Sequence, residues 1–353
     1  MKKVCILAGA RPNFVKVAPL IRALQNAEGA EFELVYAGTA TDSTLEGSLF
    51  SDLQMPRPTV YLNVDSTRLN EITSRVMAEF DAYLESHPTD VVIVVDDLAS
   101  TMAAAIVTKK RGIKLAHLVA GTRSFDINMP KEINRLVIDA LSDYLFTAGV
   151  KSNSVATREQ GETSQTYMVG NILMDTLRFN RQRLRCPSIP GVSLAEPYLV
   201  LTLNRRALLA DEERLGELLR VLVSVAGTMP VIAPLREKSA AVVKRLCSAV
   251  TIVPSLSYLE FGWLSAHAKG IITDSGNVAE EATFNGVPCI TLNSYTEHQE
   301  TVTRGTNVLV DGNASKLSEA LHTMIHGEWK SASLPDRWDG RAAERIVKIL
   351  LAE

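Results

Sequence analysis

The chain has 353 residues, of which 46% are hydrophobic and 22% are charged, and its formal net charge is −3. This length suits two domains of ordinary size, each large enough to bury a core. The slightly acidic balance provides no basic face, so we expect neither nucleic acid nor an anionic membrane as a partner.

In the first half, short apolar runs alternate with longer helical patterns, which is typical of parallel sheets covered by helices. The expected strands are residues 3–9, 32–38, 90–97 and 113–121, and the expected helices are residues 13–27, 67–87 and 101–112.

Residues 181–197 contain prolines and a glycine between charged stretches, which predicts a boundary between two domains. Beyond it the alternation resumes, with expected strands at residues 198–204, 229–235, 249–254, 270–275 and 288–293, and an amphipathic helix at residues 340–353. The predicted fold class is therefore α/β, with two Rossmann-like, doubly wound domains. A ligand cleft between them is expected, because such sheets bind ligands at the carboxyl ends of their strands.

The four cysteines lie far apart and form no CxxC pair, so we expect no metal site and a reduced, cytoplasmic protein. The first apolar run meets Arg11 too soon for a signal peptide. No apolar run approaches the roughly 20 residues that span a bilayer, so we expect no membrane insertion. Nothing in the sequence calls for a cofactor.

The motif "GARPNFVK", residues 9–16, follows the first expected strand and opens its helix. Gly9 allows a tight turn, and Pro12 suits a first helical turn. Arg11 would stand where helix amides and the dipole favour an anion. It is therefore either a phosphate or sugar contact or a surface residue at a turn.

The motif "TDSGNVAEEA", residues 273–282, joins another strand to another helix. Ser275 and Gly276 offer backbone amides that could cradle a diphosphate, and Glu281 could reach ribose hydroxyls one turn later. For Glu280, a simpler role as a partner of the helix dipole is expected.

These two motifs, in this order, resemble those of the non-hydrolysing UDP-N-acetylglucosamine 2-epimerases. The resemblance spans nearly the whole chain through "GARPNFVKVAPLIRAL", "PKEINRLVIDALSDYLF", "VGNILMDTL", "YLEFGWLSAHAKGIITDSGNVAEEATFNGVPCITL", "GTNVLV" and "DGRAAERIVKIL". It implies a GT-B-like fold with an N-terminal domain of residues 1–172, completed by the helix at 340–353, and a UDP-binding domain of residues 173–339. It also implies a homodimer and a UDP-2-acetamido sugar as the ligand.

Residue by residue, the resemblance implies that the family's nucleotide site is largely retained. The residues implied for UDP or sugar binding are Arg11, Lys16, Asn171, Arg205, Phe261, Ser275, Gly276, Glu281 and His298. His298 stands where the family usually has an arginine, which predicts weaker or pH-dependent binding of the diphosphate.

The family's acid-base positions are changed. The family reaction removes the C2 proton while UDP leaves C1 and then adds UDP back with C2 inverted, which needs titratable groups on both faces of the sugar. The family usually reads HxEAGxR, PEEINR and HRRE. This chain has Val119 at the glutamate of the first motif and Lys131 at the first glutamate of the second. In the third motif it has Asn204 at the histidine and Ala207 at the glutamate.

Four residues could supply a replacement: Asp96, Asp97, Lys131 and Glu132. The simpler alternative is that Asp96 caps a helix and that Lys131 is a solvated loop residue. Three functions follow: UDP-GlcNAc/UDP-ManNAc interconversion, another UDP-sugar reaction such as glycosyl transfer, and UDP-sugar binding without catalysis. The loop "YAGTATDST" has only small polar residues after its tyrosine, so the regulation known in this region of the family is not expected here.

Overall fold

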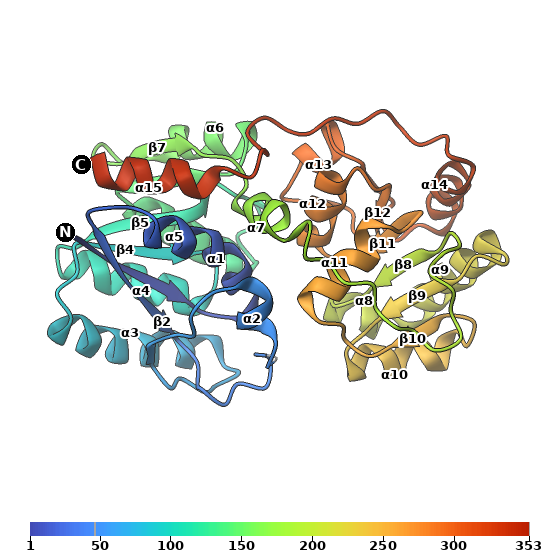
Figure 1. Cartoon of the computed structure of the whole chain (residues 1–353), viewed down its shortest axis with the longest axis horizontal. Helices are drawn as coiled ribbons and strands as arrows, with labels where there is room; N and C mark the ends of the chain where they lie inside the picture. Colours follow the sequence, from blue (N-terminus) through green and yellow to red (C-terminus); the bar gives the residue numbers. More distant parts are fainter. Residues whose placement is uncertain (46, 353) are drawn as a thin grey trace. The chain divides into compact units, whose positions relative to one another are not determined.

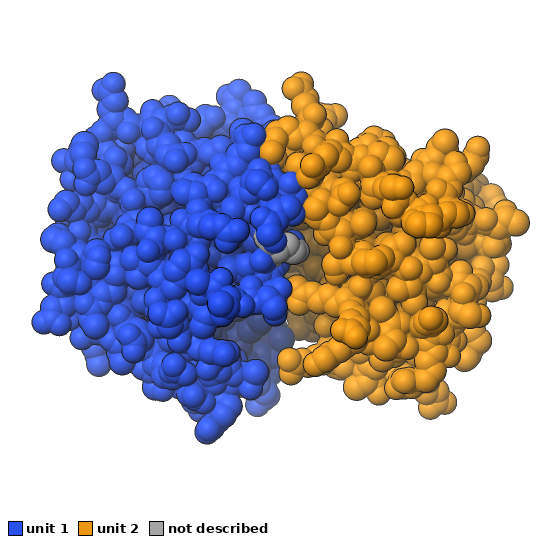
Figure 2. All heavy atoms as spheres, turned by 60° about the horizontal axis from the view of Figure 1, so that its bottom comes forward, with its two compact units in different colours: residues 1–179, 336–353 blue, residues 180–335 orange. Residues whose placement is uncertain are grey.

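The computed structural model describes residues 1–45 and 47–352, and it divides into two compact units. Unit 1 consists of Met1–Phe179 and Asp336–Glu353, and unit 2 is Asn180–Pro335 (Figure 2). None of the helices in the described part of the chain is long and apolar enough to cross a membrane.

Unit 1 contains a parallel sheet with the strand order β3-β2-β1-β4-β5-β6-β7. Figure 1 labels its strands β2, β4, β5 and β7. The strands are β1 (Lys2–Ala8), β2 (Ala30–Tyr36), β3 (Val60–Tyr61), β4 (Val91–Val95), β5 (Lys114–Ala120), β6 (Tyr144–Thr147) and β7 (Gln165–Met168). Its helices are α1 (Arg11–Gln25), α2 (Leu49–Leu53), α3 (Leu69–Ser86), α4 (Ala99–Lys110), α5 (Pro130–Leu141), α6 (Val150–Glu159), α7 (Ile172–Asn180) and α15 (Ala342–Ala352).

Strand β4 lies at the centre of this sheet, and its five residues are all apolar and all buried. Central parallel strands are covered on both faces, so they favour continuous runs of branched apolar residues. Helix α3 packs its buried residues Val76, Phe80 and Tyr83 into the same core, at the helical spacing that the sequence predicts.

Helices α7 and α15 both belong to unit 1. The Asp175 carboxylate in α7 accepts hydrogen bonds from the amides of Ala342 and Ala343, at 3.1 and 2.8 Å, at the start of α15. The Thr176 hydroxyl donates to the Val15 carbonyl of α1 at 2.6 Å. These bonds explain why unit 1 extends to Phe179, close to the boundary segment predicted at residues 181–197, whereas the family resemblance implied a boundary after residue 172.

Unit 2 contains a second parallel sheet, of order β10-β9-β8-β11-β12-β13. Its strands are β8 (Leu199–Thr202), β9 (Val231–Pro234), β10 (Thr251–Val253), β11 (Gly270–Thr273), β12 (Cys289–Thr291) and β13 (Asn307–Leu309). Its helices are α8 (Arg206–Ala210), α9 (Glu212–Ala226), α10 (Glu237–Leu246), α11 (Tyr258–Ala266), α12 (Gly276–Asn285), α13 (Glu300–Thr303) and α14 (Ala314–His326).

In each sheet the strand order reverses direction once, between β1 and β4 in unit 1 and between β8 and β11 in unit 2. Ligands of doubly wound sheets bind at such switch points, beyond the carboxyl ends of the strands. The motif at residues 9–16 follows β1, and the motif at residues 273–282 spans the end of β11. Both motifs therefore lie where their own sheet would bind a ligand.

Candidate functional site

The turn between β1 and α1 is organised by the buried side chain of Asn13. Its Oδ1 accepts hydrogen bonds from the amides of Gly9 and Ala10, at 2.8 and 3.2 Å, and its Nδ2 donates to Asp96 Oδ2 at 2.8 Å. A Cβ at Gly9 would lie 2.1 Å from Ser100 Oγ, so only glycine fits this close approach. The half-buried Arg11 opens α1 directly after this turn.

Asp96 follows β4 and faces α1. Its Oδ1 lies 2.5 Å from Lys16 Nζ, and both side chains are largely buried, at 18% and 7% exposure. Its backbone has φ 58°, the left-handed region that favours glycine. Its carbonyl lies 2.9 Å from Nε2 of His117. The helix-capping alternative for Asp96 is wrong, because the N-cap of α4 is Leu98 and the Asp96 carboxylate binds α1 instead.

Asp97 lies within a cluster of cations. Arg135 holds its Oδ2 through Nε at 2.9 Å and NH2 at 2.6 Å, and Lys131 Nζ lies 3.2 Å from its Oδ1. Burial raises the pKa of Asp97, but Lys131 and Arg135 outweigh this effect, so its pKa is lower than usual. Lys131 belongs to the first turn of α5 and pairs with Asp97, so it is not a loop lysine, although its side chain is 57% exposed and therefore solvated, as the simpler alternative expected.

Glu132 fastens the loop that precedes α5. Its carboxylate accepts from the amide and hydroxyl of Ser124 at 2.8 and 2.9 Å, from the Phe125 amide at 3.1 Å and from Arg135 NH1 at 3.1 Å. Burial raises its pKa, but these hydrogen bonds more than compensate and keep the pKa of Glu132 lowered. This carboxylate is therefore an anion that orders the loop.

A buried network that the sequence did not reveal joins α5 to the end of β5 beside Asp96. His117 Nδ1 lies 2.5 Å from Asp139 Oδ1, and Arg123 NH1 lies 2.7 Å from Asp139 Oδ2. Burial raises the pKa of Asp139, but His117 and Arg123 outweigh this effect, so its pKa is lower than usual. Both ring nitrogens of His117 face oxygen atoms, Nδ1 that of Asp139 and Nε2 the Asp96 carbonyl. His117 is thus held in place by its neighbours.

Val119 takes the place of the family's first glutamate and has an unusual backbone. Its φ is 75°, and it is the extra residue of a bulge where the pairing of β5 with β6 shifts between Leu118 and Ala120. A β-branched residue rarely adopts this conformation, which costs about 1–3 kcal/mol. The surrounding structure therefore dictates the backbone here.

In unit 2, the buried Asp274 organises the ends of β8 and β11. Its carboxylate accepts from the amides of Asn204, at 3.0 and 2.8 Å, and Arg205, at 2.7 Å. Arg205 Nε also donates to the Asp274 carbonyl at 3.0 Å. Burial raises the pKa of Asp274, although the two amides oppose this shift. This interaction brings Arg205 beside the turn that Ser275 and Gly276 form.

His298 covers that turn. A Cβ at Gly276 would lie 2.9 Å from Cδ2 of the His298 ring, so the ring lies directly over the first turn of α12. His298 Nδ1 is 2.9 Å from Glu280 Oε1, and Glu280 is almost completely buried. Glu280 therefore pairs with the imidazole, a partner that the sequence did not suggest.

The remaining expected contacts are divided between the units. Half-buried Phe261 lies in α11, and buried Glu281 lies in α12, both in unit 2. Asn171 lies in unit 1, where its Oδ1 accepts from the Leu173 amide at 3.0 Å at the start of α7. Arg11 and Lys16 are also in unit 1, on α1.

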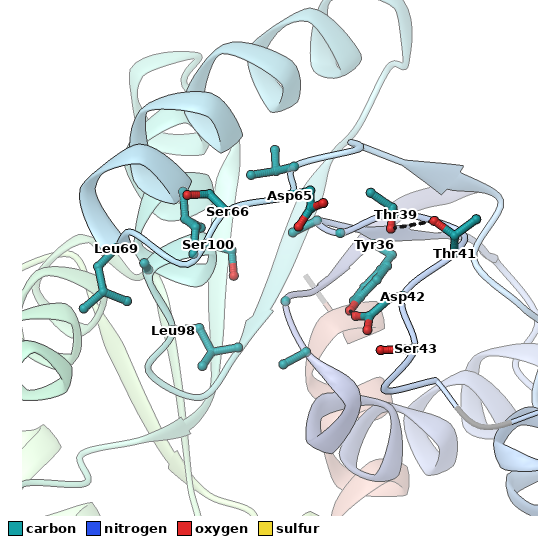
Figure 3. A pocket seen from close by; sticks show the side chains of 17 residues that line it. Tyr36, Thr39, Thr41, Asp42, Ser43, Asp65, Ser66, Leu69, Leu98 and Ser100 are labelled. Atoms are coloured by element: carbon teal, nitrogen blue, oxygen red, sulfur yellow. Dashed lines mark hydrogen bonds between the residues drawn. The ribbon is translucent and has the colours of Figure 1, made fainter. Parts of the chain in front are cut away.

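Unit 1 also contains a cavity of about 420 Å³ beside the β1–α1 turn. Hydroxyls and carboxylates contribute much of its lining, which includes Thr39, Thr41, Asp42, Ser43, Asp65, Ser66 and Ser100 (Figure 3). Asp42 points toward Tyr36, whose hydroxyl donates to its Oδ2 at 2.5 Å. The loop of small polar residues after β2 thus forms one wall of a polar cavity.

The comparisons agree on one family. A family model described as UDP-N-acetylglucosamine 2-epimerase matches residues 22–351. A UDP-N-acetylglucosamine 2-epimerase of Methanocaldococcus jannaschii is 32% identical over 366 aligned positions, which cover 99% of this chain and 98% of that protein. A UDP-2,3-diacetamido-2,3-dideoxy-D-glucuronate 2-epimerase of Pseudomonas aeruginosa is 30% identical over 353 positions, 99% of each chain.

Solved structures agree as well. The structure of the M. jannaschii UDP-GlcNAc 2-epimerase in complex with UDP-GlcNAc and UDP has a TM-score of 0.85 and 31% identity, and each chain is covered completely. The Neisseria meningitidis enzyme bound to UDP-GlcNAc has a TM-score of 0.90 at 24% identity, also over both complete chains, which shows the shared fold.

Proposed function

Because the chain belongs to the UDP-N-acetylglucosamine 2-epimerase family, and has its GT-B-type fold, we propose that it is an enzyme that binds and converts a UDP-2-acetamido sugar. The names of the relatives support this proposal, since one is an epimerase with UDP-GlcNAc and UDP in its structure and another is named for a diacetamido uronate. By the same resemblance we propose a cytoplasmic homodimer that supplies polysaccharide synthesis.

The nucleotide is proposed to bind unit 2. The turn of Ser275 and Gly276 offers the N-terminal amides of α12 to a diphosphate, and Arg205 lies beside this turn. Glu281 and Phe261 are the proposed partners of the ribose and the uracil. His298 stands where the family usually has an arginine, so the proposed binding of the diphosphate is weaker or depends on pH.

The sugar is proposed to bind unit 1, beside Asp97 and Lys131. In the proposed reaction the C2 proton moves to a base, the C2–H electron pair forms a C1=C2 double bond, and UDP leaves with the electron pair of the C1–O bond. Addition of UDP to C1 and of a proton to the opposite face of C2 then inverts C2. Asp97 is the proposed base and Lys131 the cation that faces the departing diphosphate; Asp96 and Glu132 are proposed to position these groups.

The observation that carries this proposal is the Asp97–Lys131 contact of 3.2 Å at the switch point of unit 1. It places a carboxylate and an exposed ammonium together, where the family reaction needs charged groups. Protonation of C2 from the opposite face lacks the family's usual donors, because positions 119 and 204 hold valine and asparagine. Each lost general acid or base typically slows a reaction about 10²- to 10⁴-fold, so we expect slow inversion.

One observation favours a second candidate function, binding of a UDP-sugar without turnover. The pKa values of Asp97 and Glu132 are both lowered, and a carboxylate with a lowered pKa is a weak base. A chain of this kind would bind the nucleotide sugar, leave it unchanged, and regulate or scaffold an active partner enzyme.

The deciding experiment is incubation of the purified protein with UDP-GlcNAc in deuterated water, followed by NMR. Deuterium at C2 with a ManNAc signal supports epimerisation, and binding without either signal supports the second candidate. Release of UDP without exchange at C2 would instead support glycosyl transfer, to water or to another acceptor. A calorimetric titration without any affinity for UDP would refute the proposed binding itself.

A matched variant separates lost chemistry from lost structure. The combined substitution Val119→Glu, Lys131→Glu and Asn204→His restores the usual residues of the family, and we expect it to raise C2 exchange by at least about 10²-fold. The reversion of Asn204 alone is the control, since it adds an imidazole and leaves positions 119 and 131 unchanged. Equal rates for the triple variant and this control would contradict the proposal that the acid-base set limits turnover.

A further inference from the structure

Helix α14 of unit 2 carries two exposed histidines at its C-terminal end, His322 and His326. Residues four positions apart lie on the same face of a helix, one turn above the other. The centroids of the two rings are 6.1 Å apart, and the ring planes differ by 23°. Neither ring belongs to the candidate site.

The helix holds both residues on a fixed backbone. At its start, the Asn313 side chain accepts a hydrogen bond of 2.9 Å from the Lys316 amide. Buried residues that include Leu321 and Met324 anchor the helix to the core of unit 2. Gly327 ends the helix in the left-handed conformation, with a φ of 76°. Regular helical geometry therefore sets the spacing of the two histidines.

A hydrogen bond to the backbone orients His326. Its Nδ1 lies 2.8 Å from the carbonyl oxygen of His322. Because a carbonyl can only accept, Nδ1 donates, and the neutral ring then carries its lone pair on Nε2. Histidines that bind metals usually have this arrangement, in which one ring nitrogen donates to a carbonyl or carboxylate and the other binds the metal.

The two rings are close enough to share one metal ion. Two imidazoles bound to a tetrahedral ion, with metal–nitrogen distances of about 2.0–2.1 Å, have ring centroids about 5 Å apart. The observed 6.1 Å means that each ring needs to move by only about 0.5 Å. Exposed side chains change rotamers rapidly, so this movement is small. Two histidines four residues apart on a helix are also zinc ligands in the HExxH motif.

The type of ligand selects the metal. Imidazole suits copper, nickel and zinc, whereas magnesium and calcium prefer oxygen ligands. The two charge effects at this end of α14 oppose each other. The C-terminal carbonyl groups favour a cation, and Lys269, whose Nζ would lie 3.9 Å from a Cβ at Gly327, disfavours one. The affinity is therefore expected to come from the two imidazoles.

We propose that His322 and His326 form a binding site for a divalent transition metal ion. Water completes the coordination, because the described residues contain no group of three or more His, Cys, Asp or Glu side chains that could hold a metal. The wide spacing of the cysteines argues against a zinc site made of cysteines, and this site needs none. It uses none of the residues proposed to bind the UDP-sugar, so it is independent of the proposed function.

The test is a calorimetric titration of the metal-free, untagged full-length protein with NiCl₂. The wild-type protein should bind a single Ni²⁺ ion at the pair, and Cu²⁺ should bind more tightly than Ni²⁺ or Zn²⁺. His322→Ala and His326→Ala should each weaken Ni²⁺ binding at least about tenfold, since each removes one of two ligands.

His267→Ala is the matched control. His267 is exposed at the end of α11, and its Nδ1 also lies 2.8 Å from a carbonyl one turn earlier, that of Trp263. Its ring stacks on the Trp263 ring instead of on a second imidazole. The variant should therefore bind Ni²⁺ as tightly as the wild-type protein.

Thermal unfolding gives a second measurement. An ion that binds only the folded helix stabilises it, so Ni²⁺ should raise the unfolding temperature of the wild-type protein and not that of the His322→Ala/His326→Ala double variant. Unfolding without metal verifies that each variant is folded, and His322→Asn and His326→Gln serve if an alanine variant is unstable. A wild-type Kd for Ni²⁺ weaker than about 1 mM, or an unchanged Kd in both histidine variants, would overturn the proposal.

Discussion

The contact between Lys131 and Asp97 yields a prediction whose magnitude follows from the structure. The two charges are 3.2 Å apart, and the side chains are 57% and 13% exposed. At such a distance the attraction is about 1 kcal/mol in water and about 4 kcal/mol in a medium typical of a protein surface. Because Lys131 is more than half exposed, solvent screening places the interaction near the lower figure.

Replacing Lys131 with methionine should therefore raise the pKa of Asp97, and Lys131→Glu should raise it further by adding a like charge. The measurement is an NMR titration of the Asp97 carboxyl carbon, assigned by its loss in Asp97→Asn. The matched control is Lys114→Met, because Lys114 lies 3.3 Å from Asp143 and is 59% exposed, yet it contacts a different carboxylate. An Asp97 titration that is the same in the wild-type protein and in both Lys131 variants would refute the reasoning.

The same pair gives the sign of a stability effect. The pKa of Asp97 is lower in the folded state, so its stabilising contribution is present above the ordinary pKa of an aspartate, near 4, and is lost as the pH falls through the folded value. In urea unfolding, Lys131→Met should be less stable than the wild-type protein by about 1 kcal/mol at neutral pH. The difference should shrink in acid; a difference that grew as the pH fell would contradict this assignment.

Three further predictions concern the framework of unit 1. Gly170→Ala should lower the unfolding free energy by at least about 1–3 kcal/mol in chemical denaturation, because φ is 97° and a Cβ would lie 2.1 Å from the Arg337 carbonyl oxygen. Asp139→Asn should cost about 3–5 kcal/mol in the same measurement, since it leaves buried His117 facing an amide. Burial raises the pKa of Asp175 from 3.8 to about 6, so stability should fall by roughly 3 kcal/mol as the pH rises from about 4 to 6, and Asp175→Asn should flatten that slope.

The sequence predicts the parts of the fold that local patterns determine. Apolar runs ending in turn residues correspond to β1, β4, β8 and β11, and those strands place both motifs at switch points. Short strands carry too few residues for such a pattern. The two-residue β3 exists because Val60 and Tyr61 pair with the end of β2, and no run of two residues predicts that pairing.

The contacts that determine the candidate site are harder to predict because they join residues distant in sequence. The carboxylate of Asp96 precedes α4 in the sequence, so a role as a helix cap is a reasonable expectation. Its positive φ instead turns the side chain toward Lys16, eighty positions earlier. The same holds for Asp139, which reads as one polar residue of α5 until the fold brings His117 and Arg123 against it.

The backbone at position 119 bears on whether the family's chemistry was replaced or lost. Val119 keeps a positive φ although its side chain cannot transfer a proton, so the conformation is not maintained by a reaction at this residue. The network behind it supplies a cause, since Asp139 binds the Gly121 amide at 3.0 Å as well as His117 and Arg123, and so holds the end of β5. A glutamate would enter this bulge with less strain than valine, because it lacks β-branching. The bulge therefore persists although position 119 cannot transfer a proton, and the activity proposed above rests on Asp97 and Lys131 instead.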